Sequence, residues 1–304
     1  MSLADNIKKR RLELNLSQEE LAKRAGYKAK SSIARIESGK SDVNSSKLNA
    51  LCHALDISAE DLLGASTPSK NESRTSKTIV IIQAGGKSTR NMMNVPNQFI
   101  NVNDKPIIAY VMEAYEKHPE IDDIYISCLS GWESIVKSYA KKFNISKLRS
   151  IITGGDTILK STKNALESIP NLDINNRVIL QESTRPLINL SLISKLISHY
   201  EKNGNSVVVK PMRDYVLLSE TDSSLNYIDR NLVMDLESPE IYSVKDLKHL
   251  IALVFPNNDD GSAISKLMYQ SGIKFKLLKS DSINLKIIRQ EDVYTFKTLK
   301  EVLL

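Results

Sequence analysis

A glycine-rich segment follows the first strongly β-branched run after residue 77 of the 304-residue chain. Residues 82–90 read Ile-Gln-Ala-Gly-Gly-Lys-Ser-Thr-Arg. Glycines placed directly after a strand let backbone N–H groups approach a phosphate, and Lys87 and Arg90 add positive charge to the same loop. The loop therefore predicts a phosphate-binding site, although a glycine loop alone is a weak signal and depends on the motifs around it.

A second segment with chemical potential lies near the N-terminus, where residues 16–40 read LSQEELAKRAGYKAKSSIARIESGK. Ser17 and Glu20 have the spacing of a capping box, and Gly26 can end the helix that they begin. A further helix over 30–38 would bury Ile33 and Ile36 and expose its opposite face, as a helix inserted into the DNA major groove requires. The exposed candidates for base contacts are Lys30, Ser31, Ser32 and Arg35. Gln18, at the start of the preceding helix, would contact a phosphate or brace the inserted helix.

These segments belong to regions with different hydrophobic periodicity. Residues 1–64 show only helical spacing and predict a small bundle of five short helices, the last opened by Ser58 and Asp61. Residues 65–77 (ASTPSKNESRTSK) have no aliphatic side chain larger than alanine, which predicts a flexible linker.

Residues 78–304 alternate strand-like and helix-like stretches, which is typical of crossover units around a mostly parallel sheet. The expected strands are 78–83, 123–129, 151–153, 177–181, 206–209 and 285–288; the expected helices are 107–118, 133–143, 161–169, 190–203 and one from Glu291 onward. Residues 212–242 interrupt the alternation and suggest an extended arm. The predicted fold class is multidomain: a small all-α bundle, then a Rossmann-like α/β domain with a mixed, mostly parallel sheet.

The first domain resembles the Cro/repressor-type helix-turn-helix family over residues 3–63. The capped Ser-Gln-Glu-Glu-Leu-Ala opening, the glycine turn, the Ile33/Ile36 pair and the Glu-Ser-Gly-Lys ending carry the resemblance. The turn holds one residue more than the shortest family form, so either Lys28 or Lys30 is expected to reach DNA. The resemblance implies double-stranded DNA as a partner and transcription regulation as a role. The net charge of +4 in residues 1–77 (14 Lys/Arg against 10 Asp/Glu) predicts weak DNA binding by a monomer, so a dimer reading two half-sites is the expected binding unit.

The second domain resembles the cytidylyltransferases that make CDP-methylerythritol or CDP-ribitol. The motifs that carry this resemblance occur in the family's order, from residue 78 to the C-terminus: the glycine loop, Pro96-Asn97-Gln98-Phe99, Gly154-Gly155-Asp156, Glu182-Ser183-Thr184-Arg185-Pro186, Ile228-Asp229-Arg230 and Asn284-Leu285-Lys286. The resemblance implies a nucleotidyltransferase reaction in which a polyol-phosphate oxygen attacks the α-phosphate of CTP and pyrophosphate leaves. Positioned cations are the main catalysts of such a reaction.

The resemblance also assigns site residues. Residual catalytic roles fall to Arg90 and Lys286, and a metal-binding role to Glu182, with Mg²⁺ expected only if a nucleoside triphosphate binds. The nucleotide would contact Ala84, Gly85, Gly86, Lys87, Ser88, Thr89, Arg90, Gly155 and Ser161. A polyol phosphate would contact Glu182, Arg185, Tyr215, Arg230 and Lys286.

Several family residues are replaced in this chain. The motif lysine is Asn97, the base-side arginine is Ile158, the second loop glycine is Ser88, and Tyr215 replaces a small hydroxyl residue. Neutral Asn97 cannot supply a cation to the α-phosphate, and we therefore expect binding of CTP, a CDP-polyol or a polyol phosphate with impaired turnover.

The favoured hypothesis is a homodimeric transcriptional regulator with a degenerate cytidylyltransferase-like sensor domain. An active cytidylyltransferase that regulates its own operon, and a dimerisation scaffold that binds no ligand, are the alternatives.

Composition agrees with a cytoplasmic protein. The chain is 41% hydrophobic and 26% charged, with a formal charge of +6, and no apolar run approaches the roughly 20 residues of a membrane-spanning helix. Residues 1–77 hold 14 Lys/Arg against 10 Asp/Glu, so the N-terminal quarter is the more basic part. Cys52 and Cys128 are far apart and predict neither a disulfide framework nor a zinc site. The four histidines lack ligand spacing and are expected at the surface or at helix ends.

Overall fold

The computed structural model describes residues 3–14, 16–27, 29–41, 43–55, 62, 76–87, 95–221, 224–255, 257, 259–280 and 282–303. The chain divides into two compact units, Met1–Ser73 and Arg74–Leu304, and each is described by itself. No helix within these ranges is both long and apolar enough to cross a membrane. The described cysteines, Cys52 and Cys128, are buried free thiols.

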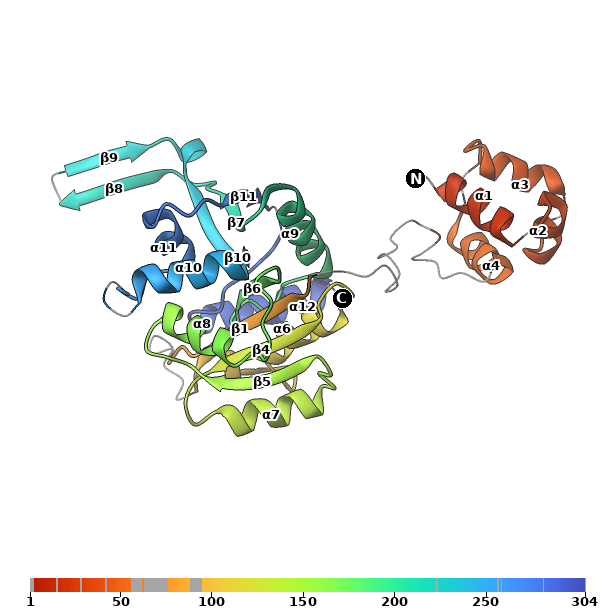
Figure 1. The fold of residues 1–304 in the computed structure, drawn as a ribbon. Helices are drawn as coiled ribbons and strands as arrows, with labels where there is room; N and C mark the ends of the chain where they lie inside the picture. Colours follow the sequence, from red (N-terminus) through yellow and green to blue (C-terminus); the bar gives the residue numbers. More distant parts are fainter. Residues whose placement is uncertain are drawn as a thin grey trace. The chain divides into compact units, whose positions relative to one another are not determined.

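The first unit is a helical bundle, as the sequence predicts (Figure 1). Its helices are α1 (Leu3–Glu13), α2 (Gln18–Arg24), α3 (Lys30–Glu37) and α4 (Ser45–Leu55). The expected capping box forms, because the Ser17 hydroxyl accepts from Glu20 N and the Glu20 carboxylate accepts from Ser17 N. Ile33 and Ile36 pack in the core and leave the other face of α3 outward. Of the expected fifth helix, opened by Ser58 and Asp61, the structure describes only Leu62, which is helical and buried in this core.

A buried ion pair fixes α3 within the first unit. The Arg11 guanidinium donates to the Glu37 carboxylate through Nε at 2.7 Å and Nη2 at 3.1 Å, and both side chains are less than a tenth exposed. Gln18 donates to the same carboxylate at 2.8 Å. Side chains from α1, α2 and α3 therefore meet at one carboxylate. Gln18 was expected either to contact a DNA phosphate or to brace α3, and this contact supports the bracing role.

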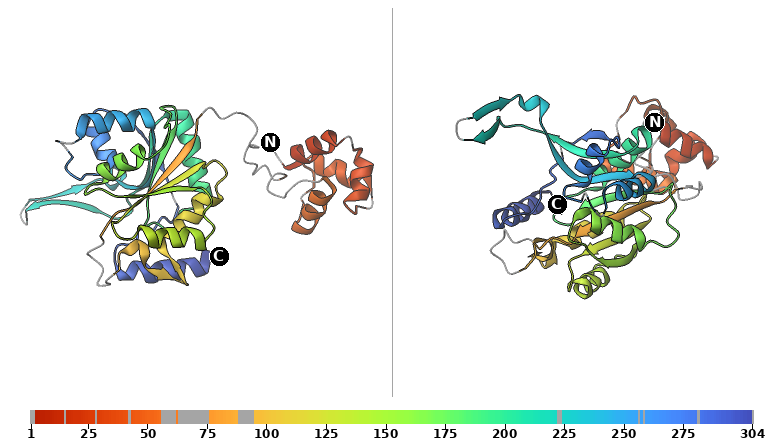
Figure 2. Two further views of the ribbon diagram at one scale, coloured as in Figure 1. Left: turned by 60° about the horizontal axis from the view of Figure 1, so that its bottom comes forward. Right: turned by 60° about the vertical axis from the view of Figure 1, so that its left-hand side comes forward.

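The second unit is a seven-stranded sheet with helices on both faces (Figures 1 and 2). The strand order is β11-β7-β10-β6-β1-β4-β5; β10 runs antiparallel to both of its neighbours, and the other pairs are parallel. The predicted mixed, mostly parallel sheet is thus confirmed. The strands are β1 (Thr78–Ala84), β4 (Asp123–Cys128), β5 (Leu148–Thr153), β6 (Arg177–Glu182), β7 (Ser206–Pro211), β10 (Met234–Ser243) and β11 (Lys276–Lys279).

Two apolar clusters separate the helices by face. One face packs on α6 (Ile107–Lys117), α7 (Glu133–Lys142) and α9 (Leu190–Asn203). The other packs on α8 (Ile158–Glu167), α10 (Val244–Val254) and α11 (Ile264–Gln270). The C-terminal helix α12 (Gln290–Leu303) joins a smaller cluster through Phe296, whose ring meets Tyr110 edge-on. Short elements complete the unit: η1 (Asn97–Phe99), β2 (Asn101–Val102), β3 (Lys105–Pro106), β8 (Val216–Thr221), β9 (Ser224–Ile228) and η2 (Arg230–Leu232).

The predicted arm over 212–242 is wrong in its second half. Only β8 and β9 form a hairpin that projects from the sheet (Figure 1). Residues 234–243 return as β10, between β6 and β7, because the apolar residues at the end of this strand, such as Ile241 and Tyr242, are buried on the sheet's two faces. Any experiment on the arm must therefore leave β10 in place.

The expected strand over 285–288 is also wrong. Its backbone bonds to loops and a side chain instead of a neighbouring strand: Ile287 N donates to Thr184 O, and Asn97 Nδ2 donates to Ile287 O and Ile288 O. The sheet ends at β11 on one edge and at β5 on the other, and the sequence did not predict β11. His118 ends α6 as expected of a cap, but it is buried, with Nε2 2.9 Å from Ser194 Oγ.

Candidate functional site

A cavity of 450 Å³ opens where the carboxyl ends of β1, β4 and β6 meet. This edge of an open parallel sheet is the usual ligand position in such folds. Its walls come from the glycine loop, η1, the start of α8, the turn after β6 and residues 286–288. The lining residues are Gln83, Gly85, Gly86, Asn97, Gln98, Ser127, Gly155, Asp156, Thr157, Ile158, Ser161, Glu182, Ser183, Thr184, Lys286, Ile287 and Ile288.

The side chain of Gln98 fixes the start of the glycine loop through hydrogen bonds. The buried Gln98 Nε2 donates to Ala84 O at 3.0 Å and to Gly86 O at 2.9 Å. These bonds engage carbonyls on both sides of Gly85. They fix the start of the loop, and a preorganised loop loses less conformational entropy when a ligand binds.

A second wall is the turn that opens α8. Thr157 caps the helix by accepting from Lys160 N at 3.0 Å, so α8 begins at Ile158 and not at the expected Ser161. Ser161 therefore lies one turn inside the helix, where its hydroxyl accepts from Gly155 N at 3.0 Å. Ile158, at the position of the family's base-side arginine, lies on the cavity wall with 39% of its surface exposed.

The third wall depends on one carboxylate. Glu182 accepts from Arg185 Nε at 2.6 Å and from Lys286 Nζ at 2.5 Å. Burial opposes the ionisation of Glu182, but the charges and hydrogen bonds of the two cations outweigh burial and lower the pKa of this carboxyl below its ordinary value. Arg185 lies behind Glu182, where it donates to Asn284 O at 2.7 Å and is 3.7 Å from Glu237. Burial raises the pKa of Glu237, against the charge of Arg185.

Asn97 occupies the position of the family's motif lysine. Its side chain is 5% exposed, and Nδ2 donates to Ile287 O at 3.2 Å and to Ile288 O at 3.0 Å. The amide thereby fixes the backbone that follows Lys286. A lysine here would bring a positive charge to the cavity wall, whereas asparagine brings a neutral clamp.

The structure brings only part of the predicted ligand-contact set together. Gly85, Gly86, Gly155, Ser161, Glu182 and Lys286 line the cavity. Ala84 is buried beneath it, and the charge of Lys87 contributes to lowering the pKa of nearby Asp156, after that of Lys160. Ser88, Thr89 and Arg90 fall outside the described residues, as does Lys28 of the first unit.

Tyr215 and Arg230 lie apart from this cavity. They line a separate hollow at the base of the β8–β9 hairpin, where the Arg230 guanidinium is 5.4 Å from the centre of the Tyr215 ring. Arg230 also donates to Arg213 O at 2.7 Å. Within one chain these two side chains therefore do not complete the cavity.

Several lining residues were not predicted. Ser127, Thr157, Ile287 and Ile288 stand in no motif, and only the fold brings them to the cavity. Gln98 and Asp156 belong to the Pro-Asn-Gln-Phe and Gly-Gly-Asp motifs, but neither was predicted as a site residue. Gln98 could have been predicted, since a glutamine in a motif near a glycine loop can hydrogen-bond to the backbone of that loop.

No cluster of three or more His, Cys, Asp or Glu suitable for a metal occurs among the described residues. Both oxygens of Glu182 face cations, which disfavours Mg²⁺ at that position. The metal assignment of Glu182 therefore stays a prediction that rests on the resemblance alone.

The candidate DNA-binding face is the outer side of α3. Lys30, Ser31 and Arg35 are exposed, and Ser32 is half-buried. Gly26 and Gly39 adopt positive φ values of 72° and 69° at the ends of α2 and α3, which glycine allows without strain. The helix is thus bounded by two tight turns, and its own Glu37 connects it to Arg11 of α1 and Gln18 of α2.

Family models match both units. The 2-C-methyl-D-erythritol 4-phosphate cytidylyltransferase model matches residues 78–299, and a helix-turn-helix model matches residues 7–62. Both resemblances are confirmed.

Curated relatives cover the second unit. A ribitol-5-phosphate cytidylyltransferase of Lacticaseibacillus paracasei is 29% identical over 222 residues, which is 71% of this chain and 95% of the relative. A 2-C-methyl-D-erythritol 4-phosphate cytidylyltransferase of Clostridium tetani is 29% identical over 232 residues, covering 72% and 89%. Among solved structures, the 4-diphosphocytidyl-2C-methyl-D-erythritol synthase of Anaerococcus prevotii superposes with a TM-score of 0.62 at 21% identity, covering 74% of this chain and 99% of the other; it shows the shared fold.

We expect the two cavity glycines to differ sharply in their tolerance of a methyl group. A Cβ at Gly155 would lie 2.4 Å from Lys160 Cγ, whereas a Cβ at Gly86 would meet nothing within 4 Å. Gly155→Ala should therefore destabilise the second unit by about 1–3 kcal/mol, and Gly86→Ala should have little effect. Denaturant unfolding followed by the fluorescence of Trp132, the single tryptophan, measures both. Equal stability of the two variants would contradict the geometry.

Proposed function

The chain belongs to the 2-C-methyl-D-erythritol 4-phosphate cytidylyltransferase family, and we propose that it is a DNA-binding transcriptional regulator whose cytidylyltransferase-like domain senses a ligand. The ligand is CTP, a CDP-polyol or a polyol phosphate, and the protein acts as a homodimer. The observation that carries the proposal is the contact of Asn97: the position of the family's motif lysine holds a neutral amide that clamps Ile287 and Ile288.

Ground-state binding requires groups that this cavity retains. Gly85 and Gly86 line the cavity, where their backbone can approach a phosphate, and Lys286 lines the same cavity. Arg90, by the resemblance, belongs to the same site. The backbone N–H donors of the glycine loop, together with the cations Lys286 and Arg90, are sufficient to bind a phosphorylated ligand.

Turnover requires more than binding, because only interactions that strengthen in the transition state accelerate the reaction. Charge builds at the α-phosphate as pyrophosphate leaves, and a lysine at position 97 would stabilise that charge. Asn97 carries no charge, and Lys286 is paired with Glu182. Without a free cation at position 97, the site should bind its ligand but catalyse the reaction slowly.

An active cytidylyltransferase that regulates its own operon is the second candidate. The observation in its favour is that the chain covers 94–95% of relatives named ribitol-5-phosphate cytidylyltransferase at 27–29% identity. Lys286 is also retained on the cavity wall. Turnover decides between the two candidates.

We expect the wild-type protein to bind CTP or a polyol phosphate but to release pyrophosphate very slowly or not at all. Asn97→Lys with Ile158→Arg should recover part of the activity, since it restores a cation at each replaced position. Pyrophosphate release measures turnover, and ligand-induced thermal shifts measure binding; Ile158→Leu is the matched control without charge. Wild-type turnover within the ordinary range of about 1–1,000 per second would overturn the sensor proposal in favour of the enzyme.

We expect Arg35→Ala to weaken binding of a cognate duplex by about 1–3 kcal/mol if Arg35 reads a base. Fluorescence anisotropy with full-length protein measures the loss. Lys23→Ala, an exposed lysine on α2, is the matched control. Unchanged affinity across alanine variants of Lys30, Ser31 and Arg35 would remove the assignment of α3.

We expect removal of the β8–β9 hairpin to convert the dimer to monomers. The hairpin places apolar side chains in solvent, with Leu225 54% and Tyr227 80% exposed, and Arg230, just after it, lies apart from its own chain's cavity. Replacing residues 216–228 by a short Gly-Ser turn keeps β10 in the sheet. Sedimentation velocity tests the assembly, and Leu253→Ser, which removes an exposed apolar residue from α10, is the control. A stable dimer without the hairpin would contradict the model.

A further inference from the structure

A strongly basic surface lies on the second unit, away from the cavity residues. It is formed by the outer side of α9 and the neighbouring edge strand β11, which Figure 1 shows beside each other. A shallow groove of 330 Å³ runs along it. We define the α9–β11 surface by Lys195, Ser198, Lys202 and Lys276, whose three lysines are exposed. Lys276 and Leu278 pair with Ser206 and Val208 on the α9 side of the sheet, whereas Lys279 lies on the opposite face.

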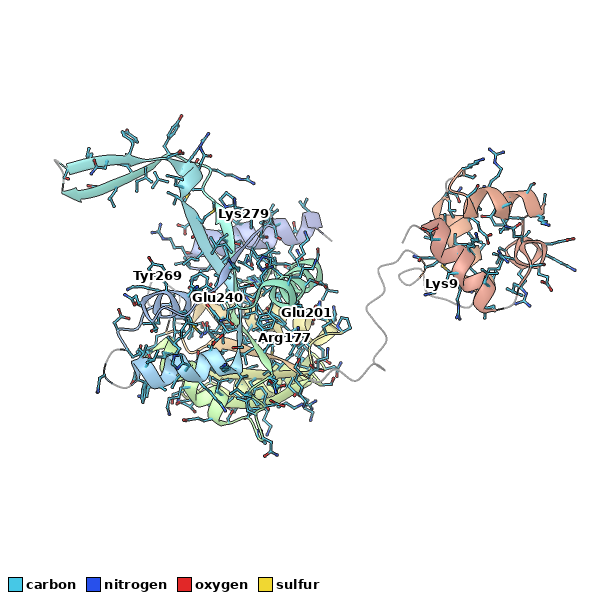
Figure 3. The ribbon with its side chains drawn as sticks, turned by 45° about the horizontal axis from the view of Figure 1, so that its top comes forward. Lys9, Arg177, Glu201, Glu240, Tyr269 and Lys279 are labelled. Atoms are coloured by element: carbon cyan, nitrogen blue, oxygen red, sulfur yellow. The ribbon has the colours of Figure 1, made fainter. Side chains whose placement is uncertain are left out.

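The charge of this surface has one sign. Residues 190–212 and 273–280 contain six lysines and a single acidic residue, Glu201. Glu201 is already paired with the buried Arg177 at 2.8 Å, and Figure 3 labels both side chains. The three lysines of the α9–β11 surface form no ion pair with any acid in the described ranges. Their charge therefore faces solvent without compensation, where it attracts polyanions.

The hydroxyls and ammonium groups repeat with the period of the helix. Ser198 follows Lys195 by three residues and Lys202 follows Ser198 by four, so these residues share one side of α9. Ser194, four residues before Ser198, is bonded to His118. These four residues line the groove together with His199, while Leu278 of β11 closes its far side. Lysine and serine side chains are the usual partners of nucleic-acid phosphates.

Protection of the sheet edge does not account for this pattern. Lysines on an edge strand commonly prevent pairing with another chain, which is sufficient for Lys276 and Lys279 on β11. Lys195 and Lys202 lie on a helix, which has no unpaired edge to protect. The helical lysines need a different reason, and a polyanionic partner supplies one.

We propose that the α9–β11 surface contacts the phosphate backbone of DNA that flanks the sequence read by α3. This proposal rests on the proposed function, because the helix-turn-helix unit of the same chain is what brings DNA close. Tethering makes the second contact intramolecular, so a few weak phosphate contacts raise the overall affinity. Because phosphate contacts carry no sequence information, the surface adds affinity and salt dependence but no specificity.

The test compares two lysine pairs in the full-length protein. Lys195→Ala with Lys202→Ala removes charge from the proposed surface. Lys137→Ala with Lys141→Ala removes the same charge from the exposed side of α7, which packs near β5 at the other end of the sheet. The probes are a duplex of about 60 bp selected from random sequence by the full-length protein, and its central segment of about 20 bp.

The α9 pair should weaken binding of the long duplex about tenfold and lower the slope of log K against log salt by about 2, and it should leave the short duplex unaffected. The α7 pair should behave as wild type on both. Equal slopes for the two pairs on the long duplex would overturn the inference while leaving the proposed function intact. If the wild-type protein selects no duplex, the inference and the proposed function are both wrong. If the α9 pair affects binding to vesicles of anionic lipid or to polyglutamate but not to DNA, the surface serves another polyanion and the inference is wrong.

Discussion

The cavity of the second unit depends on how one irregular segment, residues 284–288, is held against the ends of the sheet strands. No strand pairing keeps it there. Glu182 attracts Lys286, Asn97 clamps the two following carbonyls, and Thr184 O accepts from Ile287 N. Hydrogen bonds to a charged group are the stronger ones, and the segment has two such bonds, from Lys286 to Glu182 and from Arg185 to Asn284 O. Without these contacts the third wall would be absent, and the glycine loop and the turn before α8 would face open solvent.

The same contacts restrict the chemistry of the site. A carboxylate that holds two cations reduces their charge toward a ligand, and an amide that clamps the backbone cannot also act as a cation. The wall is well defined because its polar groups are bonded to one another. A binding pocket benefits from such preorganisation, whereas catalysis of phosphoryl transfer needs cations directed at the reacting phosphate. Asn97 thus contributes to the shape of the cavity at the position where catalysis would need charge.

Local patterns predicted most of the fold and part of the site. The capping box at Ser17 and the alternation of β-branched runs with amphipathic stretches identified the bundle and the mixed sheet, because those signals lie within a few residues of each other. The errors occurred where distant contacts decide. Residues 234–243 join the sheet through pairing with β6 and β7. The backbone of residues 287 and 288 bonds to the Asn97 side chain, 190 and 191 residues earlier, instead of to a neighbouring strand. Ser127 and Ile287 reach the cavity only through the fold, and no local pattern marks them.

Coupling between a sensed ligand and DNA affinity needs a state of the protein that both partners distinguish. The described part of the second unit offers two elements that a ligand could affect. Lys286 and Arg185 share Glu182, so a phosphate that draws Lys286 away would change the balance of charge around Arg185 and Glu237 beneath it. Glu237 belongs to β10, and β10 leads directly from the η2 turn that carries Arg230 and the hairpin. A change at the cavity therefore has a short covalent and ionic route to the proposed dimer contact.

Dimer geometry sets the spacing of two DNA-reading helices, and affinity for a two-part site depends on that spacing. A ligand that binds the two arrangements unequally would regulate DNA binding without touching the first unit.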